Sequence, residues 1–210
     1  MIRHHLTDQL LMSYAAGTLP EAFSLVAATH VSLCDDCRAR LMAFEAVGAA
    51  VMEEGSAAME GGVEACLARA TAPVASRPAP RRRQGVLPGP LADYVGGGIE
   101  NVRWQKLGMG VRQAILPTSR KASARLLYIP AGQAVPDHGH RGMELTLVLQ
   151  GAFRDETDRF GPGDVEIAGQ ELEHVPRAEP GQDCICLAAT DAPLRFKDMM
   201  PRVLQPLFRI

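Results

Sequence analysis

The stretch HVSLCDDC, residues 30–37, carries three side chains that can bind a metal within about two helical turns. His30 and Cys34 are four residues apart, so a helix would place both on one face. Cys37 completes a Cys-x-x-Cys pair, whose two thiolates can close on one ion. A structural zinc takes four ligands in a tetrahedron, and the pair His4-His5 is the nearest supply of the fourth. These residues alone leave open which of the two histidines binds.

An oxidisable thiol pair beside an unrelated histidine is the competing interpretation of this stretch. The five cysteines of the 210-residue chain are an odd number, which argues against a disulfide framework. No βαβ pattern surrounds the Cys-x-x-Cys pair, so a thioredoxin-like site is less expected than zinc. The sequence shows no cleavable leader and no apolar run near the roughly 18–20 residues of a membrane span. We therefore expect a cytoplasmic, reducing location without membrane contact.

Charge is distributed unevenly along the chain. Residues 1–72 contain four arginines, no lysine and nine acidic residues, a formal charge of −5. Residues 73–210 contain eighteen basic and fifteen acidic residues, a formal charge of +3. Direct binding of nucleic acid by the acidic part is disfavoured, because phosphate contacts need lysine and arginine. The charge fits a basic protein partner, and it fits a solvated acidic surface equally well.

Helical signals dominate residues 7–71, and we expect an all-α domain over residues 1–72. Apolar residues recur at helical spacing between capping residues and glycines. A domain of this size often needs a metal or a partner for stability. Six apolar residues could either pack together or contact a partner, and the pattern does not choose between these uses: Leu10, Leu11, Phe23, Leu41, Phe44 and Val51.

The pattern changes after the helical region. Residues 73–90 alternate prolines and arginines with few apolar residues, which predicts a semi-extended linker. From residue 91 to residue 210, short β-branched and aliphatic runs separated by Gly and Pro predict an all-β sandwich or barrel. The clearest expected strands span 111–116, 124–129, 145–149, 165–168 and 184–188.

A second set of metal-binding residues lies within this β-rich region. His138 and His140 are two residues apart, so a strand would point both to the same side. Glu144 begins the next expected strand, and His174 follows the strand 165–168. Three imidazoles and one carboxylate suit a divalent Zn, Fe, Mn or Ni ion.

These spacings resemble the two motifs of the cupin family over roughly residues 120–190. The resemblance implies a jelly-roll barrel whose metal ligands are His138, His140, Glu144 and His174. His174 lies eleven residues after Gly163, a wider spacing than the usual second motif. Cupin barrels host enzymes, storage proteins and regulators, so the fold leaves the function open.

The helical module with its His-x3-Cys-x2-Cys pattern resembles the zinc-binding anti-sigma domain. Together with a linker and a C-terminal cupin, the whole chain is similar to the ChrR-type anti-sigma factors. This resemblance implies a structural zinc held by His5, His30, Cys34 and Cys37. It implies a 1:1 complex with an extracytoplasmic-function sigma factor, which the cupin would release under singlet-oxygen or organic-peroxide stress.

Other functions compete with this interpretation. A metal-dependent cupin enzyme, such as a dioxygenase, with an accessory zinc module is the main alternative. A DNA-binding repressor is disfavoured by the acidic N-terminal part and the lack of a basic recognition helix. Cys184 and Cys186 could form a redox pair, but residues two apart in a strand fit a disulfide poorly, so burial as small apolar residues is favoured. We expect Cys66 to serve as a packing residue of a helix.

Overall fold

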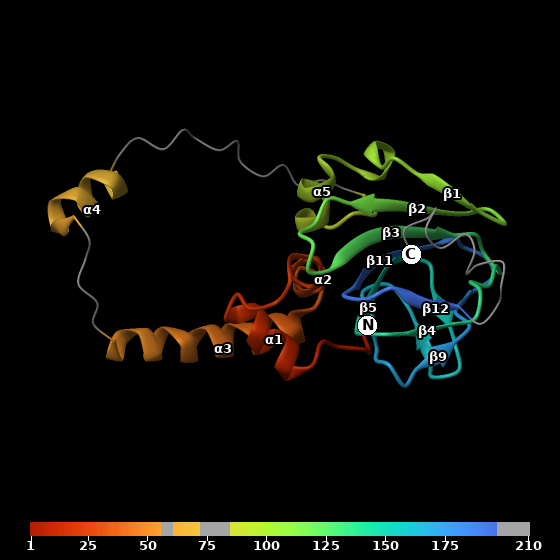
Figure 1. Cartoon of the computed structure of the whole chain (residues 1–210), viewed down its shortest axis with the longest axis horizontal. Coiled ribbons are helices and arrows are strands. Elements are labelled where there is room, and N and C mark those ends of the chain that lie inside the picture. The colour runs from red at the N-terminus through yellow and green to blue at the C-terminus, as the bar shows by residue number, and fades with distance from the viewer. Residues whose placement is uncertain (56–60, 72–84, 197–210) are drawn as a thin grey trace.

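The computed structural model describes residues 1–55, 61–71 and 85–196, with helices at the N-terminus and a β-rich barrel after them (Figure 1). The expected combination of an all-α N-terminal part and an all-β C-terminal part is confirmed. Most of the predicted linker 73–90, and the last part of the predicted β region from residue 197, lie outside the described residues.

Local signals in the sequence set the ends of the N-terminal helices. The Thr7 hydroxyl oxygen accepts a hydrogen bond from the backbone N–H of Leu10, and Gly17 follows the first helix with a φ of 67°. Pro20 directly precedes the second helix, and the sulfur of Cys34 caps the third. The helices are α1 (Asp8–Ala15), α2 (Glu21–Val31), α3 (Asp35–Glu54) and α4 (Gly62–Thr71).

The barrel is built from three antiparallel sheets and is preceded by helix α5 (Gly89–Val95) and the 3-10 helix η1 (Ile99–Asn101). The main sheet has, in spatial order, β1 (Gln105–Gly108), β2 (Val111–Leu116), β3 (Ser123–Ile129), β11 (Cys184–Thr190), β5 (Glu144–Gln150) and β8 (Val165–Ala168). The two smaller sheets are β10 (Arg177–Ala178), β6 (Phe153–Arg154) and β7 (Arg159–Phe160), and β12 (Leu194–Phe196), β4 (His138–His140) and β9 (Glu173–His174). The predicted strand bounds match β2 and β8 and fall one or two residues short of β3, β5 and β11.

The outer face of the main sheet packs against α2. Leu147 of β5 and Leu187 of β11 are directly opposite one another, and both are fully buried. They belong to one apolar core that also contains Leu25 and Val26 of α2, and α2 contacts β3, β5 and β11. Alternate residues of these strands point into the barrel, where a second, smaller core forms. The helices and the barrel therefore share the larger core.

A polar contact also fixes the start of α2 on the barrel. The carboxylate of Glu21, the first residue of α2, accepts a hydrogen bond from the Tyr94 hydroxyl at 2.7 Å. Its other oxygen accepts from the backbone N–H of Ser119 at 2.6 Å. Tyr94 lies on α5 and Ser119 lies between β2 and β3, so both partners belong to the barrel side.

Candidate metal centres

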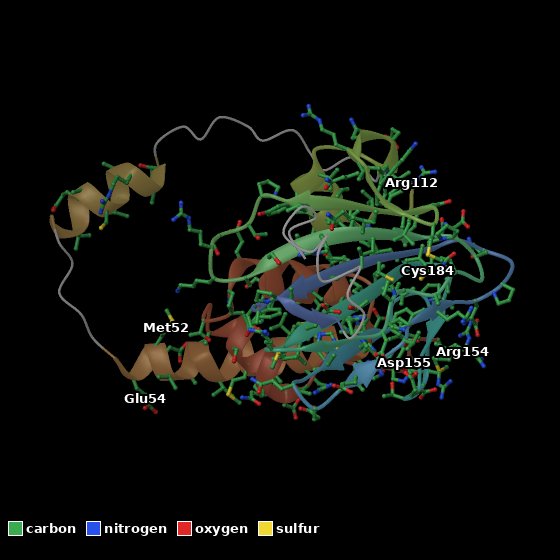
Figure 2. All side chains as sticks on the ribbon, turned by 45° about the vertical axis from the view of Figure 1, so that its right-hand side comes forward. Met52, Glu54, Arg112, Arg154, Asp155 and Cys184 are labelled. Carbon is green, nitrogen blue, oxygen red and sulfur yellow. The ribbon has the colours of Figure 1, made fainter. Side chains whose placement is uncertain are left out.

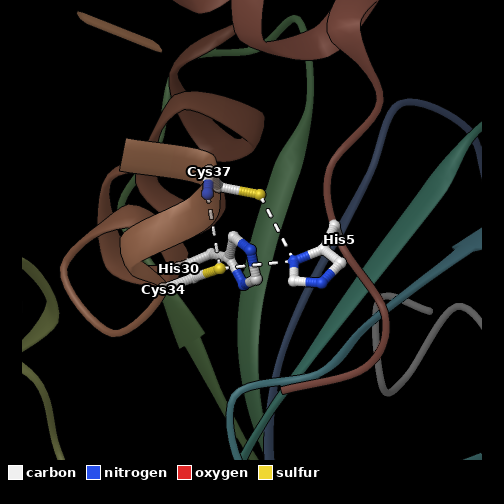
Figure 3. A group of neighbouring side chains, drawn as sticks. All are labelled: His5, His30, Cys34 and Cys37. Atoms are coloured by element: carbon white, nitrogen blue, oxygen red, sulfur yellow. Dashed lines mark hydrogen bonds between the residues drawn. The ribbon is translucent and has the colours of Figure 1, made fainter. Parts of the chain in front are cut away.

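The first candidate metal centre lies where α2 ends and α3 begins. His30 is on the last turn of α2, Cys34 caps α3, and Cys37 is in the first turn of α3 (Figure 3). His5 approaches from the segment before α1 (Figure 3). Three of these four side chains are buried and that of His5 is half-buried, so the group is shielded from solvent.

The distances within this group fit a tetrahedral ion. The four candidate ligand atoms all lie within 4.8 Å of one another. His5 Nδ1 is 3.3 Å from the sulfur of Cys34 and 3.7 Å from the sulfur of Cys37. Bond lengths of about 2.0–2.3 Å at tetrahedral angles separate ligand atoms by about 3.3–3.8 Å. The two measured separations fall in that range.

The hydrogen bonds of His30 leave one ring nitrogen available to a metal. Its Nδ1 lies 2.9 Å from the carbonyl oxygen of Gly163, and because a carbonyl can only accept, Nδ1 carries the hydrogen. Nε2 is buried and has no hydrogen-bond partner among the described residues. Burial lowers the pKa of His30 to about 4, so the ring is neutral near pH 7. A neutral imidazole with an unpartnered, buried nitrogen has the protonation state that a metal ligand needs.

The thiol of Cys37 is protonated near pH 7 when no metal is bound. Burial, together with the neighbouring Cys34, raises the pKa of Cys37 to about 11. Thiolates rather than thiols bind metals, so binding at this group releases protons. The buried, protonated state also makes Cys37 a poor nucleophile, which argues against a redox-active pair at rest.

The neighbouring histidine, His4, points away from the thiols. Its ring lies over Phe160 with the ring centres 4.5 Å apart, and its Nε2 is 3.1 Å from a carboxylate oxygen of Asp158. Its Nδ1 is 3.5 Å from Asp164. The structure thus places His5, and not His4, beside the two cysteines.

The second candidate centre lies inside the barrel, where three histidines converge. His138 and His140 are on β4, and His174 on β9 is the direct cross-strand partner of His138. The Nε2 atom of His174 is 3.2 Å from Nε2 of His140 and 3.3 Å from Nε2 of His138. All three side chains are buried. Three imidazole nitrogens this close in a buried space form half or more of a metal-binding shell.

Two carboxylates support His174 from behind. Asp155 Oδ2 is 2.7 Å from Nδ1 of His174, and Glu166 Oε1 is 3.2 Å from the same atom (Figure 2 labels Asp155). Burial alone would lower the pKa of His174, but Glu166 and Asp155 raise it to about 9. Burial raises the pKa of Glu166 to about 7. A carboxylate on Nδ1 fixes the ring so that Nε2 points toward the other two histidines.

Glu144, the fourth ligand implied by the cupin resemblance, lies at the edge of this group. Its Oε2 is 3.9 Å from Nδ1 of His140, and its Oε1 accepts a hydrogen bond from Thr146 at 3.2 Å. It is not among the ligand atoms that lie within 4.8 Å of one another, whereas His138, His140 and His174 are. The structure therefore brings three of the four residues together and leaves Glu144 next to them.

The remaining cysteines differ in environment. Cys184 and Cys186 lie in the inner core of the barrel, with their sulfurs 3.5 Å apart (Figure 2 labels Cys184). Contact with Cys184 and burial raise the pKa of the Cys186 thiol, so it is not a reactive thiolate. Cys66 is half-buried on α4.

The six apolar residues of uncertain role divide into two groups. Leu10, Leu11, Phe23 and Leu41 are buried, and Phe44 packs partly against the same core. Val51 is exposed on the part of α3 that extends away from the barrel, near Met52, which Figure 2 labels. Further large apolar side chains on α3 and α4 are also more than half exposed: Met42, Val47, Met52, Val63 and Leu67.

A known protein matches the whole chain. The anti-sigma-E factor ChrR of Cereibacter sphaeroides is 66% identical over 212 residues, which cover 100% of this chain and 99% of that protein. This chain belongs to the ChrR family of anti-sigma factors. A family model described as the ChrR cupin-like domain also matches residues 95–193 of this ChrR-family chain.

A solved structure shows the same fold. The crystal structure of Rhodobacter sphaeroides SigE in complex with the anti-sigma ChrR superposes with a TM-score of 0.81 and 64% identity. The match covers 91% of this ChrR-family chain and 100% of that chain. Within the described residues, no helix is long and apolar enough to cross a membrane.

Sequence reasoning missed several residues around both centres of this ChrR-family protein. Asp155 and Glu166 lie 19 and 8 residues before His174, and no short motif connects them to it. The carbonyl group of Gly163 has no sequence signature at all. The Pro162-Gly163-Asp164 run predicts a turn, but nothing in it indicates which residues that turn contacts.

Replacing Cys37 by serine tests the first centre. Mutating a residue that only supports a ligand typically lowers metal affinity by about 10–100-fold. Because Cys37 would itself bind the ion, we expect a larger fall in the metal affinity of this group. Cobalt(II) absorption from thiolate coordination measures it, since the barrel histidines supply no thiolate. Cys66→Ser on α4 serves as the control and should leave the absorption intact. An unchanged spectrum in Cys37→Ser would contradict the assignment.

Replacing Asp155 by asparagine tests the support of His174. The amide keeps the size but accepts a hydrogen bond from Nδ1 less strongly, so metal affinity in the barrel should fall about 10–100-fold. Chelator competition on the full chain measures this affinity. Asp158→Asn, in the same turn but exposed, is the matched control. Equal affinities for the two variants would show that Asp155 does not position the ligand.

Proposed function

We propose that this anti-sigma factor binds an extracytoplasmic-function sigma factor in a 1:1 complex through the exposed apolar surface of α3 and α4. The observation that supports this surface is the set of large apolar side chains on these two helices that no other part of the described chain covers. Val47 and Val51 are four residues apart on α3, and Val63 and Leu67 are four apart on α4. Each pair therefore lies on one helix face, as in helices that dock into apolar grooves.

The charge of the N-terminal part supports a protein partner rather than nucleic acid. Residues 1–72 carry a formal charge of −5, which would repel phosphates and attract a basic surface of a DNA-binding protein. We place the complex in the cytoplasm, where sigma factors meet RNA polymerase.

For the organisation of the chain, we propose an anti-sigma domain over residues 1–72, a linker over residues 73–90 and a cupin domain over residues 91–210.

We propose that His5, His30, Cys34 and Cys37 hold a structural zinc ion. Four protein ligands would leave the ion no open position for a substrate, which suits a structural role. The ion would tie the N-terminal segment to the end of α2 and the start of α3. Because α3 carries much of the proposed binding surface, metal binding here would also fix the direction in which that surface points.

For the barrel, we propose zinc or another divalent transition metal held by His138, His140, His174 and Glu144. Bound there, the metal would supply a Lewis-acidic centre that an oxidant could alter through its ligands. We propose a regulatory and not a catalytic role for this centre, because the relative that matches the full length is an anti-sigma factor. In this proposal, singlet oxygen or an organic hydroperoxide alters the barrel site, and the sigma factor is released.

Aspartate substitutions test the binding surface. Val51→Asp and Leu67→Asp each place a charge on an apolar face, and we expect affinity for the cognate sigma factor to fall about 30-fold or more, as at an interface hot spot. Titration calorimetry with the purified sigma factor measures this. Met109→Asp, at an apolar residue of the β1–β2 turn that is also more than half exposed, should bind normally. Normal binding by both helix variants would move the interface elsewhere.

Oxidant treatment of the purified complex tests the release step. We expect an organic hydroperoxide, or a photosensitiser under light, to free the sigma factor from the unaltered chain. The His140→Ala complex should release several-fold less, because the barrel site is incomplete. Arg141→Ala, next to this histidine but exposed, should release as the unaltered chain does. Equal release from the His140→Ala complex would exclude the barrel metal as the sensor.

A further inference from the structure

The turn before β8 contacts the first metal centre from the barrel side. The carbonyl oxygen of Gly163 accepts the hydrogen of His30 Nδ1 at 2.9 Å, although the two residues are 133 positions apart. This contact is what leaves Nε2 of His30 free to face the thiols. A barrel residue therefore sets the tautomer of a helical ligand.

The same turn holds the segment that carries His5. One carboxylate oxygen of Asp164 accepts hydrogen bonds from the backbone N–H groups of Arg3 at 2.6 Å and His4 at 3.0 Å. The backbone N–H of Val165 donates to the carbonyl oxygen of His4 at 3.2 Å. Asp164 is itself buried, so these bonds form out of solvent and fix the chain directly before His5.

The same stretch of chain reaches the second metal centre. Glu166 lies two residues after Asp164 on β8, and its Oε1 is 3.2 Å from Nδ1 of His174. From Gly163 to Glu166 the backbone spans only about 10 Å at the rise of a β-strand. Within that distance the chain contacts two ligand-bearing segments of the first centre and one ligand of the second.

We propose that residues 163–166 couple the two metal centres, so that losing the barrel metal weakens metal binding by His5, His30, Cys34 and Cys37. This inference rests on the proposal that both groups bind metal. Movement of His174 displaces Glu166 and, with it, the turn that orients His30 and the His5 segment. Partners outside the ligand shell change metal affinity by about 10–100-fold, and coupling between sites of about 5–150-fold is common.

Cobalt(II) titration of the full-length chain, followed by thiolate-to-metal absorption, tests the link because only the first centre supplies thiolates. In Asp164→Asn, the single amide oxygen cannot accept from both the Arg3–His4 backbone and the Gly161 backbone, as Asp164 does. We expect the affinity of the first centre to fall about tenfold or more. Asp158→Asn is the matched control, because this exposed carboxylate contacts the His4 side chain but not the backbone amides of Arg3 or His4.

A second pair of variants tests the coupling itself. With Asp164 unaltered, His140→Ala should weaken cobalt binding at the thiolate centre at least fivefold. When Asp164→Asn is already present, adding His140→Ala should cause no further loss of cobalt affinity at that centre. Thermal melts followed by circular dichroism select variants that remain folded. Ile2→Ala is a milder second test of the turn, because the Ile2 side chain occupies the space that a Cβ on Gly163 would enter.

The possible outcomes distinguish a failure of the coupling between the two centres from a failure of the proposed metal sites. No thiolate absorption in the unaltered chain would overturn both the first metal site and the link. Suppose that the unaltered chain shows thiolate absorption, but the cobalt affinities of Asp164→Asn and Ile2→Ala stay within twofold of its own. That result would overturn the coupling alone. An effect of His140→Ala that is the same with and without Asp164 would also overturn it, because the two centres would then communicate by another route.

Discussion

Burial of α2 from two sides is the constraint on which the rest of the molecule depends. One side of this helix packs against α1 and α3, and the other packs against the outer face of the main sheet. Its buried residues include His30, so the packing that joins the helices to the barrel also positions a candidate metal ligand. Removing water from this interface is what makes the ring of His30 neutral and leaves its Nε2 without a hydrogen-bond partner among the described residues.

The parts of this structure that could be predicted from sequence are those set by residues close together in the chain. Thr7, Gly17 and Pro20 mark helix ends because each acts on backbone groups a few positions away. His30, Cys34 and Cys37 come together because helical spacing places them so, and His138 and His140 do so because a strand repeats every two residues. The confirmed fold class follows from these short-range patterns.

What could not be predicted depends on contacts between distant segments. One such contact, the packing of α2 on the sheet, is nevertheless indicated by the sequence of α2. This helix has scarcely any polar face, and a helix that is apolar all round is buried on every side. No comparable signal pointed to Asp155, Asp164 or the carbonyl group of Gly163. An acidic residue in a turn is common in any sequence, and only the folded chain shows that these face a histidine or a backbone amide. The choice of His5 over His4 likewise depends on Phe160, a barrel residue against which the His4 ring packs.

The exposed apolar side chains of α3 and α4 have a consequence for the supply of this protein in the cell. A free chain presents valines, leucine and methionines to water, and such surfaces attract proteases, chaperones and other free chains. In the proposed complex, the sigma factor would cover this surface and keep proteases and chaperones from it. Surplus copies would then be short-lived and paired copies long-lived, so turnover alone would hold the inhibitor near a one-to-one ratio with its target.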